Sequence, residues 1–161
     1  MRFNKVFVLA VMLLCIACAR RSTDEPPAFP VGEDDTAMNS AMEKSRESVD
    51  TFIGALQSPK AGQSGFAIKK RFSDGKHTEH IWLLPVTYDG KRFQGVVNNI
   101  PVDITGVAIG QSVFVEPNQI SDWMYLENGK LMGGYTIRVL RERMAPAERI
   151  EFDRSGGFVV E

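Results

Sequence analysis

The sequence predicts an α+β domain. We expect an N-terminal amphipathic helix packed on a curved antiparallel sheet or small half-barrel, followed by one or two short C-terminal helices. Three observations predict it: a long apolar stripe with helical spacing, then several short apolar runs separated by glycine-rich turns, and finally a second stretch with helical spacing. The chain has 161 residues, and the part that follows the leader described below is about the size of one domain.

The first eighteen residues have the pattern of a secretory signal peptide. Arg2 and Lys5 form a basic head, and residues 6–17 form an uncharged run, too short to span a bilayer as a mature helix. The residues before Cys18 match a bacterial lipobox at positions −1 and −2, whereas a cysteine replaces the usual Leu or Val at −3. We therefore expect residues 1–17 to be a lipoprotein signal peptide and Cys18 to carry a lipid. The alternative is a plain leader that is cleaved elsewhere.

Both cysteines of the chain lie in this leader region, so a lipidated and folded domain would have no disulfide and no cysteine metal ligand. By analogy with well-studied Gram-negative envelopes, Ala19 after Cys18 favours the outer membrane over inner-membrane retention. We expect a protein of the bacterial cell envelope that faces the periplasm, with the membrane as a partner through the lipid on Cys18.

The composition divides the rest of the chain into a tether, a domain and a tail. Residues 18–35 combine prolines and acids without an apolar period, which predicts a flexible tether. A single α+β domain is expected over 36–154, and glycines near the end indicate a loose tail over 155–161. The formal net charge is −1, and this charge balance lacks the basic excess that nucleic-acid binding needs.

The first helical stripe covers residues 36–57. Asp35 or Thr36 can cap its start, and Ser58-Pro59 ends it. We expect this face to dock on the sheet, because the strands that follow can bury it. The apolar positions of the stripe are Met38, Met42, Val49, Phe52, Ile53 and Leu56.

Five to seven short strands are expected next. Asp74-Gly75, Asp89-Gly90 and Asn128-Gly129 have the composition of tight turns. Pro85 interrupts the longest apolar run, so a bulge or a sheet edge is expected there. The expected strand segments are 66–72, 79–88, 93–97, 102–104, 112–115, 123–126 and 131–132.

Two helices are expected at the C-terminal end. Residues 136–144 place Ile137, Leu140 and Met144 on one helical face. A last short helix is expected to begin near Ala145, with Pro146 at its first position.

His77 and His80 are the only histidines, and their H-x-x-H spacing raises the question of a metal site. Residues three apart on a strand point to opposite faces, and the surrounding sequence implies no third ligand. We therefore expect no metal and no cofactor. The sequence also lacks the motifs of nucleophilic, zinc-dependent and phosphate-loop enzymes, so we assign no catalytic residue.

Aromatic residues gather around two of the predicted strands and a glycine pair. Trp123 and Tyr125 share one face of a strand, and Gly133-Gly134 allows close approach of another backbone. Such residues are typical of a groove that binds a ligand or partner. The alternative is that both tryptophans are core residues and that Asp122 braces a turn. The predicted binding residues are His80, Trp82, Asp122, Trp123, Tyr125, Tyr135 and Arg138.

Four segments are distinctive: FAIK at 66–69, EHIWL at 79–83, ISDWMY at 120–125 and GGYTIR at 133–138. Through them, residues 38–153 resemble a bacterial domain-of-unknown-function family of YegJ-like proteins. The resemblance implies a compact α+β domain found in lipoproteins and sometimes beside other modules. It implies no activity and no catalytic residue.

The sequence thus favours a lipid-anchored envelope protein whose domain binds a protein or another envelope partner without catalysis. One alternative is an envelope enzyme that acts on a polymer or small molecule, and a pocket holding His80 and Asp122 within hydrogen-bond reach would favour it. The other is an immunity-type protein that blocks a toxin, which an acidic groove would favour if the toxin is basic.

Overall fold

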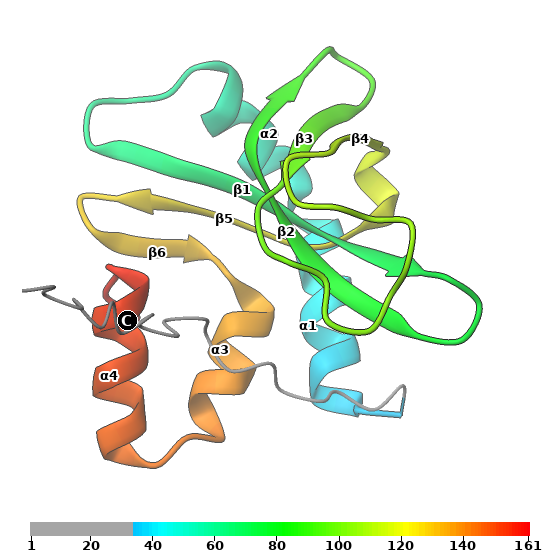
Figure 1. Cartoon of the computed structure of the whole chain (residues 1–161). Helices are drawn as coiled ribbons and strands as arrows, with labels where there is room; N and C mark the ends of the chain where they lie inside the picture. Colours follow the sequence, from blue (N-terminus) through cyan, green and yellow to red (C-terminus); the bar gives the residue numbers. More distant parts are fainter. Residues whose placement is uncertain (1–33) are drawn as a thin grey trace, which may run out of the picture.

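The computed structural model describes residues 34–161. The predicted signal peptide, Cys18 and most of the tether lie outside the described residues. Within them, four α-helices and one six-stranded antiparallel sheet form an α+β fold (Figure 1). The sheet is curved and unclosed, so the predicted fold class is confirmed. None of the helices in this part of the chain is long and apolar enough to cross a membrane.

The elements follow one another with short connections, apart from the long loop between β3 and β4. The helices are α1 (Thr36–Glu47), α2 (Val49–Gln57), α3 (Tyr135–Glu142) and α4 (Pro146–Gly156), and a 3₁₀ turn η1 covers Pro117–Gln119. The strands are β1 (Gln63–Ser73), β2 (Thr78–Tyr88), β3 (Phe93–Val97), β4 (Ser112–Val115), β5 (Ile120–Glu127) and β6 (Lys130–Gly133).

The strand order is β4-β3-β2-β1-β5-β6, so β1 lies inside the sheet between β2 and β5. The three predicted turns connect β1 to β2, β2 to β3 and β5 to β6 as expected. At Pro85 the register of β2 against β3 shifts between Leu83 and Val86. This proline therefore lies at the predicted bulge, in the part of β2 that pairs with β3 but extends beyond the pairing with β1, which ends at Leu83.

The helix predicted over 36–57 is two helices that meet at Ser48. Asp35 caps α1 as expected, because its Oδ1 accepts the Met38 N–H at 3.1 Å. At the junction, the Ser48 hydroxyl donates to the Lys44 carbonyl at 2.7 Å, a back-bond that bends helices. The Trp123 indole N–H also donates to the Ser45 carbonyl at 2.9 Å. A contact from a distant strand therefore stabilises the break.

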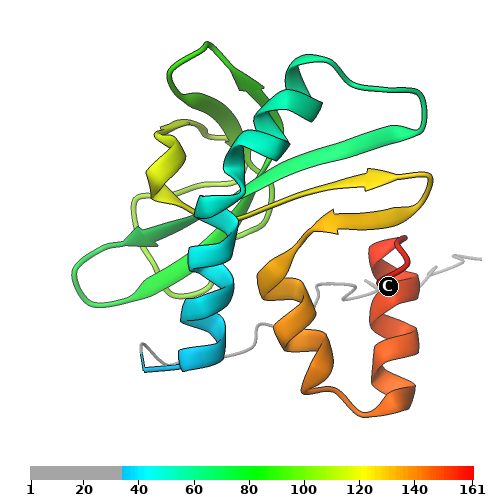
Figure 2. The same ribbon diagram turned by 180° about the vertical axis from the view of Figure 1, so that it is seen from behind.

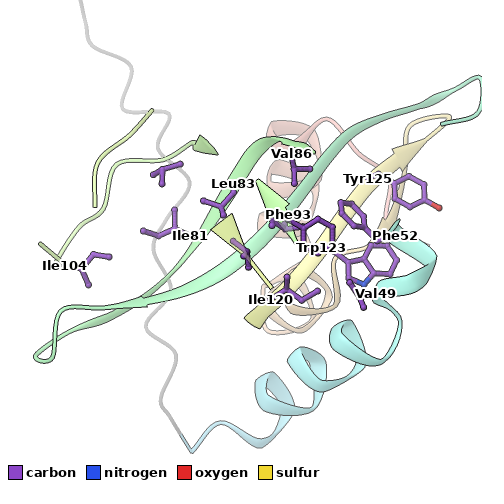
Figure 3. Close-up of a cluster of buried hydrophobic side chains, with 13 residues drawn as sticks. Val49, Phe52, Ile81, Leu83, Val86, Phe93, Ile104, Ile120, Trp123 and Tyr125 are labelled. Atoms are coloured by element: carbon purple, nitrogen blue, oxygen red, sulfur yellow. The ribbon is translucent and has the colours of Figure 1, made fainter. Parts of the chain in front are cut away.

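The main core lies between α2 and one face of the sheet. Figure 2 shows α1 and α2 crossing this face, and Figure 3 shows Phe52 of α2 inserted among the side chains of the strands. Apolar burial here supplies most of the folding free energy. The buried residues of this core are Val49, Phe52, Ile68, Ile81, Leu83, Val86, Phe93, Val97, Ile104, Val115, Ile120, Trp123 and Tyr125.

A smaller cluster covers part of the opposite face. It joins Leu131 of β6, Ile137 of α3 and Phe158 after α4, with Trp82 packed against them. The helices α3 and α4 lie side by side near the β6 edge (Figures 1 and 2). The Arg141 guanidinium ties them together through two bonds of 2.8 Å to the Asp153 carboxylate.

Two local predictions are wrong. Residues 102–104 form no strand, because the Glu79 carboxylate accepts the backbone N–H groups of Val102, Asp103 and Ile104 that a ladder would use. The segment 155–161 also differs from the expected loose tail. The last helix continues to Gly156, Phe158 is buried, and Val159 bridges to Lys130 beside β6.

Candidate functional site

The aromatic residues of the predicted groove do not line a common surface. Trp123 and Tyr125 are 3% and 4% exposed, and they belong to the main core. The Trp123 ring lies 5.5 Å from the ring of Phe52, centroid to centroid, and 6.1 Å from that of Tyr125. Tyr135 meets the edge of Trp123 at 5.8 Å. Their arrangement is that of packed core residues, which was the alternative interpretation of this cluster.

Asp122 is fully buried and holds the start of α3. Its carboxylate accepts the backbone N–H groups of Tyr135 at 3.1 Å and Thr136 at 2.8 Å, and the Thr136 hydroxyl at 2.6 Å. The residue before α3 is Gly134, whose absent side chain cannot cap the helix. Asp122 of the neighbouring strand therefore provides the missing cap from the side.

Lys69 of β1 completes this buried polar group, and sequence reasoning missed it. Its Nζ donates to the Thr136 hydroxyl at 3.3 Å and lies 5.2 Å from the centre of the Trp82 ring. Burial lowers the pKa of Lys69, although the Asp122 charge opposes this effect. Burial likewise raises the pKa of Asp122, against the hydrogen bonds from Thr136. The sequence did contain a sign of this residue. Lys69 is the lysine of the FAIK segment, and alternation along the strand places it on the face opposite Ile68.

Arg138 holds the backbone of β6 and the C-terminal end. Its guanidinium donates to the carbonyls of Gly133 at 2.9 Å, Leu131 at 2.6 Å and Glu161 at 2.8 Å. An arginine with three carbonyl partners of this kind stabilises a junction between segments. The structure thus places Asp122 and Arg138 in separate structural clusters.

A cavity of about 390 Å³ lies between α1, η1 and the adjacent ends of three strands, and we call it the α1–η1 cavity. Of the predicted binding residues, His80 lines it. Its volume falls within the range of small-molecule sites, roughly 300–1,000 Å³. The lining residues are Asn39, Met42, Arg46, Arg71, Thr78, His80, Asn118, Gln119, Ile120 and Ser121.

Ser121 is the unusual member of this lining. It is 3% exposed, and its Oγ is the one buried side-chain polar atom without a hydrogen-bond partner among residues 34–161. Lys69 pairs with Asp122 and Lys70 pairs with Ile120, so Ser121 is the extra residue of a β-bulge. A bulge redirects a side chain, and bulges are common beside functional sites. The β-bulge therefore positions the hydroxyl. No neighbouring group offsets the free-energy cost of leaving it without a hydrogen bond.

The charges of the cavity come from two arginines. Arg46 of α1 donates from Nη1 to the Ile120 carbonyl at 3.4 Å, and Arg71 of β1 donates from Nη2 to the Thr78 hydroxyl at 3.2 Å. No aspartate or glutamate is among the residues that line this cavity. Burial, assisted by the charges of Lys69 and Arg71, lowers the pKa of His80 to about 4. The imidazole is therefore neutral at pH 7.

The two histidines lie in different surroundings. His77 is in the turn before β2, where its Nδ1 lies 3.8 Å from an Asp74 carboxylate oxygen. His80 faces the cavity. Among residues 34–161, no group of three histidine, cysteine, aspartate or glutamate side chains is arranged to hold a metal ion.

Sequence reasoning missed Ser121, Arg46 and Arg71. A sign of the bulge at Ser121 lies in the ISDWMY segment. Ile120 and Trp123 both face the main core, whereas in a regular strand residues three apart point to opposite faces. The arginines left no signal, because α1 and β1 carry several other charged residues on exposed faces.

Comparisons with known proteins identify one family and two relatives. The family described as "Uncharacterized protein conserved in bacteria (DUF2314)" matches residues 35–159. The uncharacterized protein YegJ of Escherichia coli is 37% identical over 133 residues, which cover 83% of this chain and 86% of that protein. A putative ankyrin repeat protein of Neisseria meningitidis is 43% identical over 84 residues, 52% of this chain and 33% of that protein. No solved structure gives a significant match.

Proposed function

Because the chain belongs to the bacterial DUF2314 family, we propose that it acts through the folded domain that defines this family, as a binding module of the cell envelope. The proposed attachment is a lipid on Cys18, with the segment before Asp35 as the tether. The proposed binding site is the α1–η1 cavity, which differs from the aromatic groove expected from the sequence.

The observation that carries this proposal is the buried, unpartnered hydroxyl of Ser121 at the cavity wall. Leaving a buried polar group without a partner costs about 1–3 kcal/mol. Such a group adds nothing to the stability of the chain, so the proposal is that it is retained for a ligand, which would reach the oxygen after a small movement of the side chains around it. The bulge that places Ser121 there supports the same interpretation.

The cavity also bears on the two alternative functions, an envelope enzyme and an immunity-type protein that blocks a toxin. An enzyme of the kind considered would bring His80 and Asp122 together, but His80 lines the cavity while Asp122 bonds to the first turn of α3. A groove for a basic toxin would be acidic, but the lining carries Arg46 and Arg71. Both observations favour a binding module for a neutral or anionic partner.

Site-specific photo-crosslinking in cells tests this proposal. The full lipid-bearing chain would carry a photoreactive phenylalanine derivative at Asn118, an exposed residue of the cavity wall, or at Ile150, which is 70% exposed on α4. We expect a defined adduct from position 118 that is absent from position 150. The absence of any adduct at 118, or identical adducts at both positions, would overturn the assignment of the cavity.

A further inference from the structure

We propose that a fork in the sheet binds an extended peptide segment of a partner protein by β-strand addition. The fork lies between residues 63–67 of β1 and residues 84–88 of β2, and we call it the β1–β2 fork. It shares no lining residue with the α1–η1 cavity, so this inference goes beyond the proposed function and does not depend on it. Three observations carry it: an open edge of β1, an apolar groove beside this edge, and a leucine that packs in neither hydrophobic cluster.

The first observation is that β1 is longer than its pairing with β2. The β1–β2 ladder ends where Ile68 lies opposite Leu83, whereas the β1–β5 ladder continues to Gln63. Beyond Leu83, β2 pairs with β3 alone. Figures 1 and 2 show the two strands diverging beyond this point, with α2 between them. Within the described part of the chain, residues 63–67 therefore have a neighbouring strand on one side only.

Pro85 gives a physical reason for the separation of the two strands. If the β1–β2 register continued, Phe66 would lie opposite Pro85. Proline has no N–H to donate to a neighbouring strand, and the pairing of β2 with β3 is irregular at the same place. The edge of β1 is therefore left without β2, and a strand from another protein has no competitor there.

The edge of β1 in the fork is accessible. Ser64 and Gly65 are exposed, and Phe66 is half-buried. Alternate residues of a strand direct their N–H and C=O groups to opposite sides, so part of this backbone faces the fork. An unpaired strand edge of this kind is a template for pairing with another extended chain.

The second observation is an apolar groove of about 450 Å³ in the fork. Leu56 of α2, Phe66 of β1 and Val86 of β2 supply side chains to it, and Gly65 has no side chain to cover the β1 backbone. No charged residue is among those that line the groove, and Asn98 provides its one polar side chain. Because side chains alternate along a strand, every second residue of an added strand would face this groove.

The third observation concerns Leu84, which also lines the groove. Leu84 is half-buried and belongs to neither hydrophobic cluster, whereas its neighbours Leu83 and Val86 are buried in the main core. A single surface leucine is ordinary. Beside an open strand edge, however, Leu84 and the exposed Pro85 extend the apolar lining from the core to the surface.

Together these features define the chemistry of the partner. The open edge recognises the backbone of an extended chain, and the groove beside it selects side chains. The uncharged lining gives no advantage to a charged side chain. We therefore expect a partner segment that has apolar residues at alternate positions, with small or polar residues between them.

Selection from a random heptapeptide library displayed on phage tests the proposal, with the immobilised full chain as the target. We expect the enriched peptides to have apolar residues at alternate positions. N-methylation of the backbone along one edge of a synthetic enriched peptide should weaken binding at least tenfold, whereas methylation along the other edge should have little effect. Amide hydrogen exchange within residues 63–67 should slow when this peptide binds.

Variants show whether the peptide binds in the fork. Leu84→Ser should weaken its binding at least tenfold, because the substitution removes part of the apolar lining. Since Leu84 belongs to neither cluster, this variant should fold, and a thermal melt followed by circular dichroism checks it. The matched control is Ile150→Ser, at a residue that is 70% exposed on α4, and it should bind the peptide as the unaltered chain does.

The outcomes separate this inference from the proposed function. Strand addition is overturned if no peptide is enriched, or if the enriched peptides tolerate methylation along both edges. Equal binding to a folded Leu84→Ser chain overturns the fork as the site. Self-association that Leu84→Ser abolishes, without any selected peptide, would make a second copy the occupant and also overturn the proposal. The adduct at position 118 reports on the α1–η1 cavity alone, so its loss would leave peptide binding in the fork intact.

Discussion

At the scale of single residues, two neighbours in β5 have opposite hydrogen-bonding states. The Asp122 carboxylate accepts N–H and O–H groups from Trp123, Tyr135 and Thr136. The hydroxyl of Ser121 has no partner. Both are buried, so the difference separates a polar group that is used for folding from one that adds nothing to it.

Replacing these neighbours should therefore have opposite effects. Asp122→Ala leaves several buried donors without their acceptor and removes the negative charge near Lys69, and we expect a loss of about 3–5 kcal/mol in the free energy of unfolding. Ser121→Ala should leave that free energy unchanged or slightly higher. Urea unfolding followed by circular dichroism measures both. A loss below about 1 kcal/mol for Asp122→Ala would contradict the capping role of this carboxylate.

The protonation of His80 predicts a pH dependence of stability. Its pKa falls from 6.5 in the unfolded chain to about 4 in the folded domain, so the unfolded state binds more protons between these values. The free energy of unfolding should therefore rise as the pH increases from 4 to 6.5, by on the order of 2–3 kcal/mol from this group.

His80→Gln isolates this contribution, because the variant keeps the carboxylates that also titrate in acid. The difference in unfolding free energy between pH 4 and pH 7 should be smaller in the variant than in the unaltered chain. Equal pH dependence in the two proteins would show that the folded domain does not depress the pKa of this histidine.

At the scale of elements, one aromatic side chain is central to the packing of α2 on the sheet. Phe52 is fully buried, and its ring centroid lies 6.0 Å from that of Phe66 and 5.8 Å from that of Phe93. The bend at Ser48 lets α2 direct this residue into the core while α1 borders the cavity (Figure 3).

Phe52→Ala should cost about 3–5 kcal/mol in unfolding free energy, because it removes a large side chain from a packed core. A suitable control is Leu56→Ala, a partly buried position on the same face of α2, which should cost clearly less. Thermal or urea unfolding gives both values. Equal costs would mean that the two residues share the same degree of burial in solution.

The junction between β6 and α3 requires glycine. Gly133 has φ +68°, and a Cβ there would lie 2.4 Å from Trp123 Cε3. Gly133→Ala should therefore lower the melting temperature by several degrees or prevent folding. Gly54→Ala in α2 is the matched control, since a Cβ there meets nothing within 4 Å and alanine favours helix. The control should be as stable as the unaltered chain or more stable.

Periodicity and turn composition predicted most of these elements. The alternation in β1 and the glycine-containing turns act within a few residues, so their effect is visible in the sequence. The break at Ser48 depends on Trp123, and the loss of the strand at 102–104 depends on Glu79. Both are contacts between distant segments, and local patterns do not contain them.

At the scale of the whole molecule, the candidate site was less predictable than the fold. The α1–η1 cavity is formed where Arg46, Arg71, His80 and Ser121 meet, and these residues belong to four different elements. His80 was predicted because it lies beside Trp82 in the longest apolar run of the sequence. Aromatic content was a poor guide for Trp123 and Tyr125, which are buried, because large apolar side chains serve a core as well as a binding surface.

The attachment of the domain to a membrane remains a prediction that one substitution tests. Cys18→Ala should abolish labelling by a radioactive or clickable fatty acid and leave an uncleaved precursor, because the thiol is the proposed lipid acceptor. Cys15→Ala is the matched control and should still be labelled and processed. Normal processing of the Cys18→Ala chain to the same size would show that the protein is not a lipoprotein.

The interior position of β1 also sets the order in which the sheet can be completed. Its pairing with β2 is local, whereas its pairing with β5 joins segments far apart in the chain and carries the larger cost in loop-closure entropy. During synthesis, β1 to β4 emerge before β5. Phe52 therefore cannot pack against Trp123 until β5 has been made. High contact order of this kind slows folding. We therefore expect nascent chains that end at Val115 to remain protease-sensitive, and protection to begin once β5 and β6 have been made.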